Sequence, residues 1–187
     1  ICGSGLVDAC ASLVQLGLLD NSGRFVPQEI AEKVAPKVAN RLVEREGERV
    51  FVLTWGGKEG DLNDCVFLTQ RDVRELQFAK AAIATGWALL LEEFGVAESE
   101  IQQVLLAGSF GSYLSPASAV KIGLVPKLPV MRIVSAGNVA GEGAKMVLLS
   151  AQERNGATAL LESIDYIELS DRADFNDKFV ERLSFPA

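Results

Sequence analysis

The stretch Val104-Leu105-Leu106-Ala107-Gly108-Ser109-Phe110-Gly111 decides the fold class. Four consecutive apolar residues are typical of a short buried strand, and the glycine that follows predicts its end. Glycine between a strand and a helix tolerates positive φ and lets the backbone approach a ligand closely. A helix is then predicted from Ser115 as N-cap and Pro116 in the first turn. Strand, glycine loop and helix in this order are typical of α/β domains.

A second unit of the same kind lies further along the chain. Arg132-Ile133-Val134-Ser135 is a further candidate for a buried strand, Gly137-Asn138 follows it, and a helix is predicted over residues 140–150. In α/β sheets, ligands bind beyond the carboxyl ends of the strands. The glycine-rich loops 108–111 and 137–143 both occupy such positions. We therefore expect one α/β domain over residues 1–187, with a partly parallel, mixed sheet flanked by helices.

Turn and capping signals divide the rest of the chain. Ser4 is the expected N-cap of a first helix, and the apolar runs 50–53 and 66–68 predict a hairpin with a long polar loop. Thr69 and Asp72 predict a capping box that opens the longest helix, which Gly95 ends. Less marked patterns predict one or two short surface helices within 28–48, a helix over 153–163, a strand over 166–169 and a C-terminal amphipathic helix that carries Phe175 and Phe179.

Composition excludes several classes of function. The 187 residues are 49% hydrophobic and carry a net charge of −7, so they can form a core and would repel nucleic acid and anionic membranes. The chain has no histidine, which removes histidine-based catalysis and imidazole zinc sites. Its three cysteines form no CxxC pair, and no apolar run is long enough to span a membrane. We expect a cytoplasmic protein without a metal site of its own.

Taken together, the motifs resemble a known family. They are Ile1-Cys2-Gly3-Ser4-Gly5-Leu6-Val7-Asp8, Leu106 to Gly111, Ile122-Gly123-Leu124-Val125-Pro126, Val134 to Ala144 with its glycines, Phe175-Asn176-Asp177 and Phe185-Pro186. Over nearly its whole length the chain resembles the C-terminal domain of the reductive activators of corrinoid proteins. This resemblance implies one lobe of the ribonuclease H-like, actin-like ATPase fold that actin, Hsp70 and sugar kinases share.

The resemblance also implies a function for a longer parent. Such activators carry a [2Fe–2S] ferredoxin-like domain and use ATP and magnesium while they return a corrinoid protein from Co(II) to Co(I). Because the chain starts at Ile1 and holds no ferredoxin cysteines, we expect it to be a fragment that binds ATP weakly by itself and is inactive alone. The expected partners are the corrinoid iron–sulfur protein of a methyltransferase system and, as a further candidate, a second copy of the parent.

The residues expected to contact nucleotide come from four segments, each of which has a plainer interpretation. The loop 108–111, after the strand over residues 104–107, would hold adenosine, although a turn needed only for packing would also require its glycines. The first helix start would hold phosphate, unless it is an ordinary helix end. Lys80 would reach adenine or ribose, unless it is a surface lysine. Asn138 would sit at a hinge, or it would simply cap a helix. The full set is Gly3, Ser4, Gly5, Lys80, Gly108, Ser109, Phe110, Gly111, Gly137 and Asn138; no catalytic residue is assigned.

Two other functions stay open at this point. One is a non-catalytic docking or dimerisation module of an iron–sulfur protein that has lost nucleotide use, because no acidic magnesium-site motif is visible. The other is an activator of a dehydratase, in which cysteines of two subunits bridge a cluster. Cys2, Cys10 and Cys65 have no spacing that supports that option.

Overall fold

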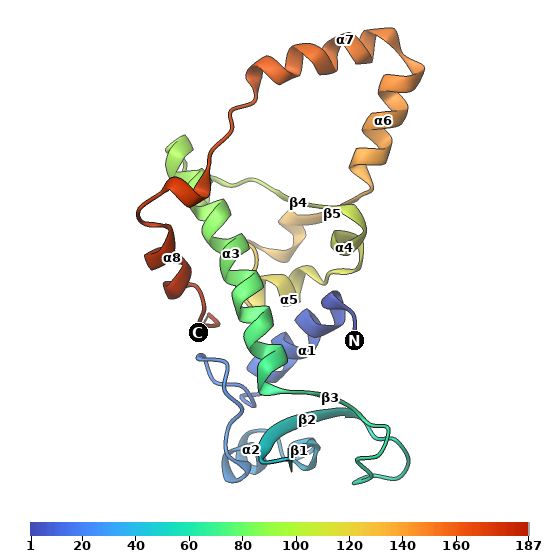
Figure 1. Ribbon diagram of the computed structural model, residues 1–187, viewed down its shortest axis with the longest axis vertical. Coiled ribbons are helices and arrows are strands. Elements are labelled where there is room, and N and C mark those ends of the chain that lie inside the picture. Colours follow the sequence, from blue (N-terminus) through green and yellow to red (C-terminus); the bar gives the residue numbers. More distant parts are fainter. Residues whose placement is uncertain (187) are drawn as a thin grey trace.

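The strands form two separate sheets, which helices connect and cover (Figure 1). In the computed structural model, which describes residues 1–186, one sheet is antiparallel with the order β1-β2-β3, and the other pairs β4 with β5 in parallel. The elements, in chain order, are α1 (Gly3–Gln15), α2 (Gln28–Val34), η1 (Ala39–Arg41), β1 (Leu42–Arg45), β2 (Glu48–Thr54), β3 (Val66–Leu68), α3 (Gln70–Phe94), η2 (Glu98–Glu100), β4 (Val104–Ala107), α4 (Gly108–Tyr113), α5 (Pro116–Lys121), η3 (Val130–Arg132), β5 (Ile133–Gly137), α6 (Val139–Leu149), α7 (Ala151–Leu160), η4 (Leu161–Ser163), η5 (Leu169–Asp171) and α8 (Phe175–Glu181).

Helix α3 runs along the middle of the molecule from the antiparallel sheet upward (Figure 1). Its capping box forms as predicted: Thr69 Oγ1 accepts a hydrogen bond from the Asp72 backbone N–H at 3.0 Å, and Asp72 Oδ2 accepts one from the Thr69 N–H at 2.8 Å. Gly95 ends the helix in the left-handed conformation with φ of 65°. The hairpin of β2 and β3 is also confirmed.

The hydrophobic core lies between α1, α3, α5 and the antiparallel sheet. It is built largely from aliphatic side chains, to which Phe25, Phe51 and Phe185 add aromatic rings. Leu18, Leu68 and Ile122 are at most 1% exposed and come from three distant parts of the chain. Burial of apolar surface, at about 25 cal/mol per Å², therefore holds this region of the molecule together.

Helices α6 and α7, called the arm below, project from the end of the molecule that lies away from the antiparallel sheet (Figure 1). Neither helix has a buried residue, and each begins with a side-chain cap. The Asn138 side chain accepts a hydrogen bond from Gly141 N, and the Ser150 side chain accepts one from Glu153 N. The arm is therefore defined by local capping and by contact between its own two helices.

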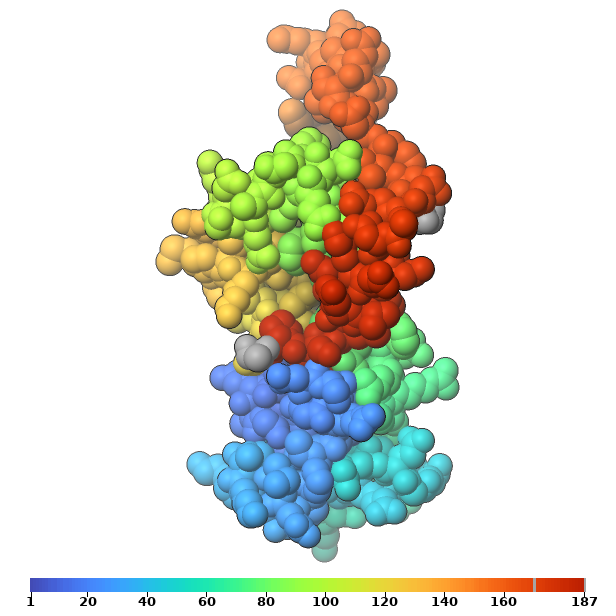
Figure 2. Space-filling view, turned by 90° about the vertical axis from the view of Figure 1, so that its left-hand side faces the viewer, coloured from blue at the N-terminus to red at the C-terminus, as the bar shows by residue number. Residues whose placement is uncertain are grey.

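The C-terminal region returns from the arm to α3. Phe179 of α8 stacks on Phe78 of α3, with ring centroids 6.0 Å apart. Residues 183–186 follow α8 and are called the C-terminal strap below. They lie between α3 and the turn at residues 20–23 (Figure 2). The strap adds Phe185, which is 2% exposed, to the core.

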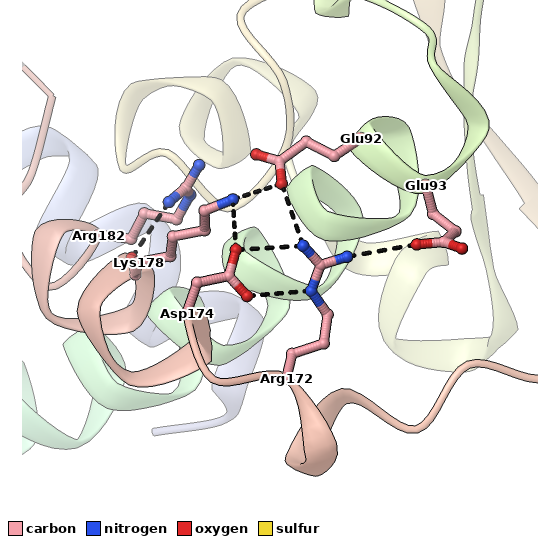
Figure 3. A network of polar contacts seen from close by, with 6 residues as sticks. All are labelled: Glu92, Glu93, Arg172, Asp174, Lys178 and Arg182. Atoms are coloured by element: carbon pink, nitrogen blue, oxygen red, sulfur yellow. Dashed lines mark hydrogen bonds and ion pairs between the residues drawn. The ribbon is translucent and has the colours of Figure 1, made fainter.

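An ion network adds to this attachment of α8 (Figure 3). Asp174 accepts hydrogen bonds from Arg172 and Lys178. At the end of α3, Arg172 also pairs with Glu92 and Glu93, and Lys178 pairs with Glu92. The hydrogen bond from Arg172, followed by that from Lys178, holds the pKa of Asp174 well below its usual range. Residues 172–178 are therefore joined to α3 by charge as well as by ring stacking.

Several sequence predictions were wrong in detail. Ser4 is not the N-cap of α1, which begins at Gly3 after Cys2 and has no side-chain cap. Residues 166–169 form no strand, because no neighbouring strand pairs with them; Leu169 instead begins the 3-10 helix η5. Strand β1 was missed because its sequence, Leu-Val-Glu-Arg, is half charged. Strand β4 is not fully buried, and Leu105 is 62% exposed.

Candidate functional site

Three of the four predicted segments meet at the carboxyl end of the parallel sheet. Ala107 at the end of β4 pairs with Gly137 at the end of β5, so the two glycine-rich segments leave the sheet side by side. They are not the predicted loops: residues 108–111 open helix α4, and after Gly137-Asn138 the second segment is helix α6. The Phe110 ring lies over the start of α1, where a Cβ on Gly3 would be 3.1 Å from it. We call this meeting of Gly3, Gly108, Phe110 and Gly137 the glycine junction.

Backbone conformation explains the glycines of the two loops. Gly108 has φ of 85° and Gly137 has φ of 65°, a region that side-chain-bearing residues rarely adopt. A Cβ at either position would meet no atom within 4 Å, so the space in front of both glycines is open. Gly111 has a different role, because a Cβ there would lie 2.8 Å from the backbone of Leu106. Gly111 thus allows α4 to pack on β4.

The polar groups at the junction are mainly backbone amides. Ser109 and Asn138 stand exposed at the starts of α4 and α6. Asn138 caps α6 through Gly141, which was the plainer of its two interpretations. Asp8 follows Gly5 by one turn of α1, and its Oδ1 is buried without a hydrogen-bond partner among residues 1–186. It is the carboxylate that the structure leaves available near the start of α1.

Sequence analysis did not single out Cys2 at the N-cap of α1. Its exposed Sγ lies 3.3 Å from Ser4 Oγ. The hydrogen bond with Ser4 and a further one from the Gly5 backbone lower the pKa of the Cys2 thiol below its ordinary value. The position of a cysteine at a helix start was the available signal, because helix N-termini stabilise thiolates. By contrast, burial raises the pKa of Cys10 to about 12.

Lys80 lies apart from the glycine junction. It was predicted either to contact nucleotide or to extend along the surface. In the structure it is 2% exposed, on the side of α3 that the C-terminal strap covers. Its ammonium donates to the Ser184 carbonyl and lies 5.4 Å from the centroid of the Phe185 ring. The structure therefore brings together the glycine segments and excludes Lys80 from them.

The described residues 1–186 bear on metal binding and on membrane insertion. No group of three or more histidine, cysteine or acidic side chains is arranged to hold a metal ion in this part of the chain. None of the helices described there has the length and apolar character needed to cross a bilayer.

Comparisons with known proteins agree with this architecture. A family model described as the C-terminal domain of RACo, the ASKHA domain, matches residues 1–187. The corrinoid activation enzyme RamQ of Eubacterium limosum is 36% identical over 185 residues, which are 98% of this chain and 31% of RamQ. A solved structure titled reductive activator for corrinoid, iron–sulfur protein is 33% identical and superimposes with a TM-score of 0.81, covering 100% of this chain and 28% of that one. The chain thus spans less than a third of the relatives it matches.

Proposed function

The chain belongs to the family of C-terminal ASKHA domains of RACo, and from that premise we propose that it is the nucleotide-responsive lobe of a reductive activator of a corrinoid protein. Membership also gives it the actin-like ATPase fold, one lobe of which the two sheets and their helices form. The activity belongs to the longer protein, in which a ferredoxin-like [2Fe–2S] domain outside this chain would carry the electron.

The glycine junction carries the proposal. It places two positive-φ glycines with open space before them at the ends of paired parallel strands, with Gly3 to Gly5 of α1 alongside. Exposed backbone at such strand ends and helix starts suits adenosine and phosphate groups. Gly108 and Ser109 would hold the nucleoside, and Gly3 and Ser4 a phosphate. Asp8 is the carboxylate that would orient water around magnesium.

ATP is required because electron transfer to Co(II) corrinoid runs against the potential difference. Each ~59 mV of unfavourable potential for one electron corresponds to about 1.4 kcal/mol. Bound nucleotide can supply several times this free energy if it favours the conformation that docks the corrinoid protein. In this proposal the glycine junction senses nucleotide, and the longer protein works in the cytoplasm with a corrinoid iron–sulfur protein as its partner.

A steric variant of the longer protein tests nucleotide binding. Ser109→Leu adds a bulky side chain next to Gly108 without requiring positive φ, since Ser109 lies in α4. Calorimetric titration with Mg·ATP should give a dissociation constant at least ~10-fold higher, a difference of about 1.4 kcal/mol. Ser99→Leu is the matched control, because Ser99 is exposed in η2 outside the junction, and its affinity should equal that of the wild type.

The same titration separates a second candidate, a docking module that does not use nucleotide. The arm favours this alternative, because Met146, Leu148 and Leu149 are more than half exposed on α6. If wild-type protein binds no Mg·ATP, or if Ser109→Leu binds it as tightly as wild type, the nucleotide proposal is wrong. A wild-type protein without nucleotide affinity would then support the docking module.

A further inference from the structure

A cleft of about 630 Å³ lies away from the glycine junction, between α3, the segment that follows α5 and the C-terminal strap. Its walls include Lys80 and Trp87 of α3 and Phe185 of the strap. Apart from Lys80, no residue predicted to bind nucleotide lines it. Its volume is in the range of small-molecule sites, which is about 300–1,000 Å³.

Charge distinguishes this cleft from the rest of the molecule. Four cations line it, Lys80, Lys121, Lys127 and Arg182, against two carboxylates, Glu98 and Glu181, so its local charge is positive although the chain carries −7. Within residues 1–186, no ion pair joins any of these four cations to a carboxylate. The cleft therefore holds cationic charge that the described residues do not neutralise.

Lys80 is the part of this charge that is least able to reach water. Lys80 is only 2% exposed, and its ammonium donates a hydrogen bond to the uncharged carbonyl of Ser184. A buried ammonium without a carboxylate partner is costly, and a bound anion would offset that cost. Lys80 also lines the cleft, so an anion placed there would share its cavity.

The walls of the cleft also carry apolar and aromatic side chains, and these define the rest of the ligand. The Trp87 indole is held in place, because its Nε1–H donates to the Leu124 carbonyl at 3.2 Å. Val125, Pro126 and Phe185 add further apolar surface. We propose that the cleft between α3 and the C-terminal strap binds a small molecule that joins an oxyanion, a carboxylate or a phosphate ester, to a planar apolar body.

The titration of Lys80 agrees with this geometry. Burial, and next the nearby Arg182 charge, lower the pKa of Lys80 to about 8. A bound oxyanion would raise that pKa again, so binding and protonation of Lys80 would be coupled. Above pH 8 the lysine loses its charge in the empty cleft, and affinity for an anion should fall.

Fluorescence of Trp87 provides the assay. With Trp55 and any tryptophan outside residues 1–187 replaced by Phe, Trp87 is the remaining tryptophan, and it lines the cleft. Benzoate and phenyl phosphate serve as probes that separate carboxylate from phosphate, and phenol is the uncharged control. We expect saturable fluorescence changes with one or both anions, weaker binding of phenol, and about 10-fold weaker benzoate binding at pH 9 than at pH 7.

Variants identify the residues responsible. Lys80→Met keeps most of the volume and removes the charge, and it should weaken benzoate or phenyl phosphate binding about 10-fold. Lys121→Gln, at the partly exposed rim, gives a second measurement that does not depend on a core substitution. Lys145→Met is the control, since Lys145 is exposed on the arm. Phenol binding as tightly as the anions, no saturation with either anion, or unchanged affinity in both cleft variants would overturn the proposal.

Discussion

Thr69 and Ser150 each begin a helix with the same hydrogen bond, yet the two helices stand in very different surroundings. The hydroxyl of each residue accepts a bond from the backbone N–H three residues later, at 3.0 Å for Thr69 and 3.2 Å for Ser150. Helix α3 then packs Val73, Leu76 and Leu89 into the interior, whereas α7 has no buried residue. Local signals thus suffice to define both helices, but burial supports only one of them.

This contrast divides the molecule into a body and an arm. Isolated short helices are marginal in water, because most helical stability in proteins comes from packing of one face. The body around α1, α3 and the antiparallel sheet should therefore unfold cooperatively, while α6 and α7 open at low free energy. Three experiments would break or sharpen this division.

The largest expected effect comes from equivalent truncations in the two regions. Leu68→Ala removes a side chain that is 1% exposed in the core, and it should lower the free energy of unfolding by about 2–5 kcal/mol. Leu149→Ala removes the same atoms from a side chain that is 84% exposed on α6, and the change should be near zero. Denaturant unfolding of both variants measures this difference. Equal losses would mean that the arm is packed in solution.

A second experiment uses the pH dependence of stability. Lys80 in the folded body has a pKa of about 8, against 10.5 when unperturbed. Between these values the unfolded state holds more protons than the folded state, so raising the pH favours folding. From pH 7.5 to pH 10, Lys80 should add about 2 kcal/mol to the free energy of unfolding.

The variant Lys80→Met isolates this contribution from other groups that titrate in the same range. One of these is Cys10, whose pKa is raised to about 12 and whose effect has the opposite sign. The difference in unfolding free energy between wild type and variant should therefore grow in favour of the wild type as the pH rises. A difference that stays constant with pH would show that Lys80 is solvated, and it would weaken the separation between body and arm.

The smallest effect concerns the two caps. Thr69→Ala should lower the free energy of unfolding by about 1 kcal/mol, because the loss of a cap on α3 is felt by the whole body. Ser150→Ala should leave global unfolding unchanged and speed amide hydrogen exchange at residues 151–156. Exchange measured in both variants decides the question, and a cooperative loss in Ser150→Ala would join the arm to the body.

Local chemistry made most of the fold predictable. The capping box at Thr69, the helix end at Gly95 and the strand over residues 104–107 all rest on near neighbours in sequence, and the structure confirms them. The failures were of a different kind. Strand β1 and the absence of a strand at 166–169 depend on which segments find a pairing partner, and a single stretch of sequence does not contain that information.

The candidate site divides in the same way. The glycine loops lie at strand ends because strand, turn and helix follow one another, and their meeting depends only on parallel pairing of β4 with β5. The burial of Lys80 away from the glycine junction was not predictable, because its surroundings come from residues 183–186, more than a hundred positions later. The cleft beside it was missed for the same reason, since its four cations come from three distant segments.

The C-terminal strap also has a consequence for the order of events during synthesis. Gln77 donates to the carbonyls of Ser22 and Leu183, and the Phe185 N–H donates to the carbonyl of Asn21, so the strap joins the early turns of the chain to α3. A ribosome completes α3 long before it adds residues 183–185. Until then Gln77 and Lys80 lack acceptors that they use in the folded body. The interior along α3 would therefore stay incomplete while residues 95–182 are synthesised.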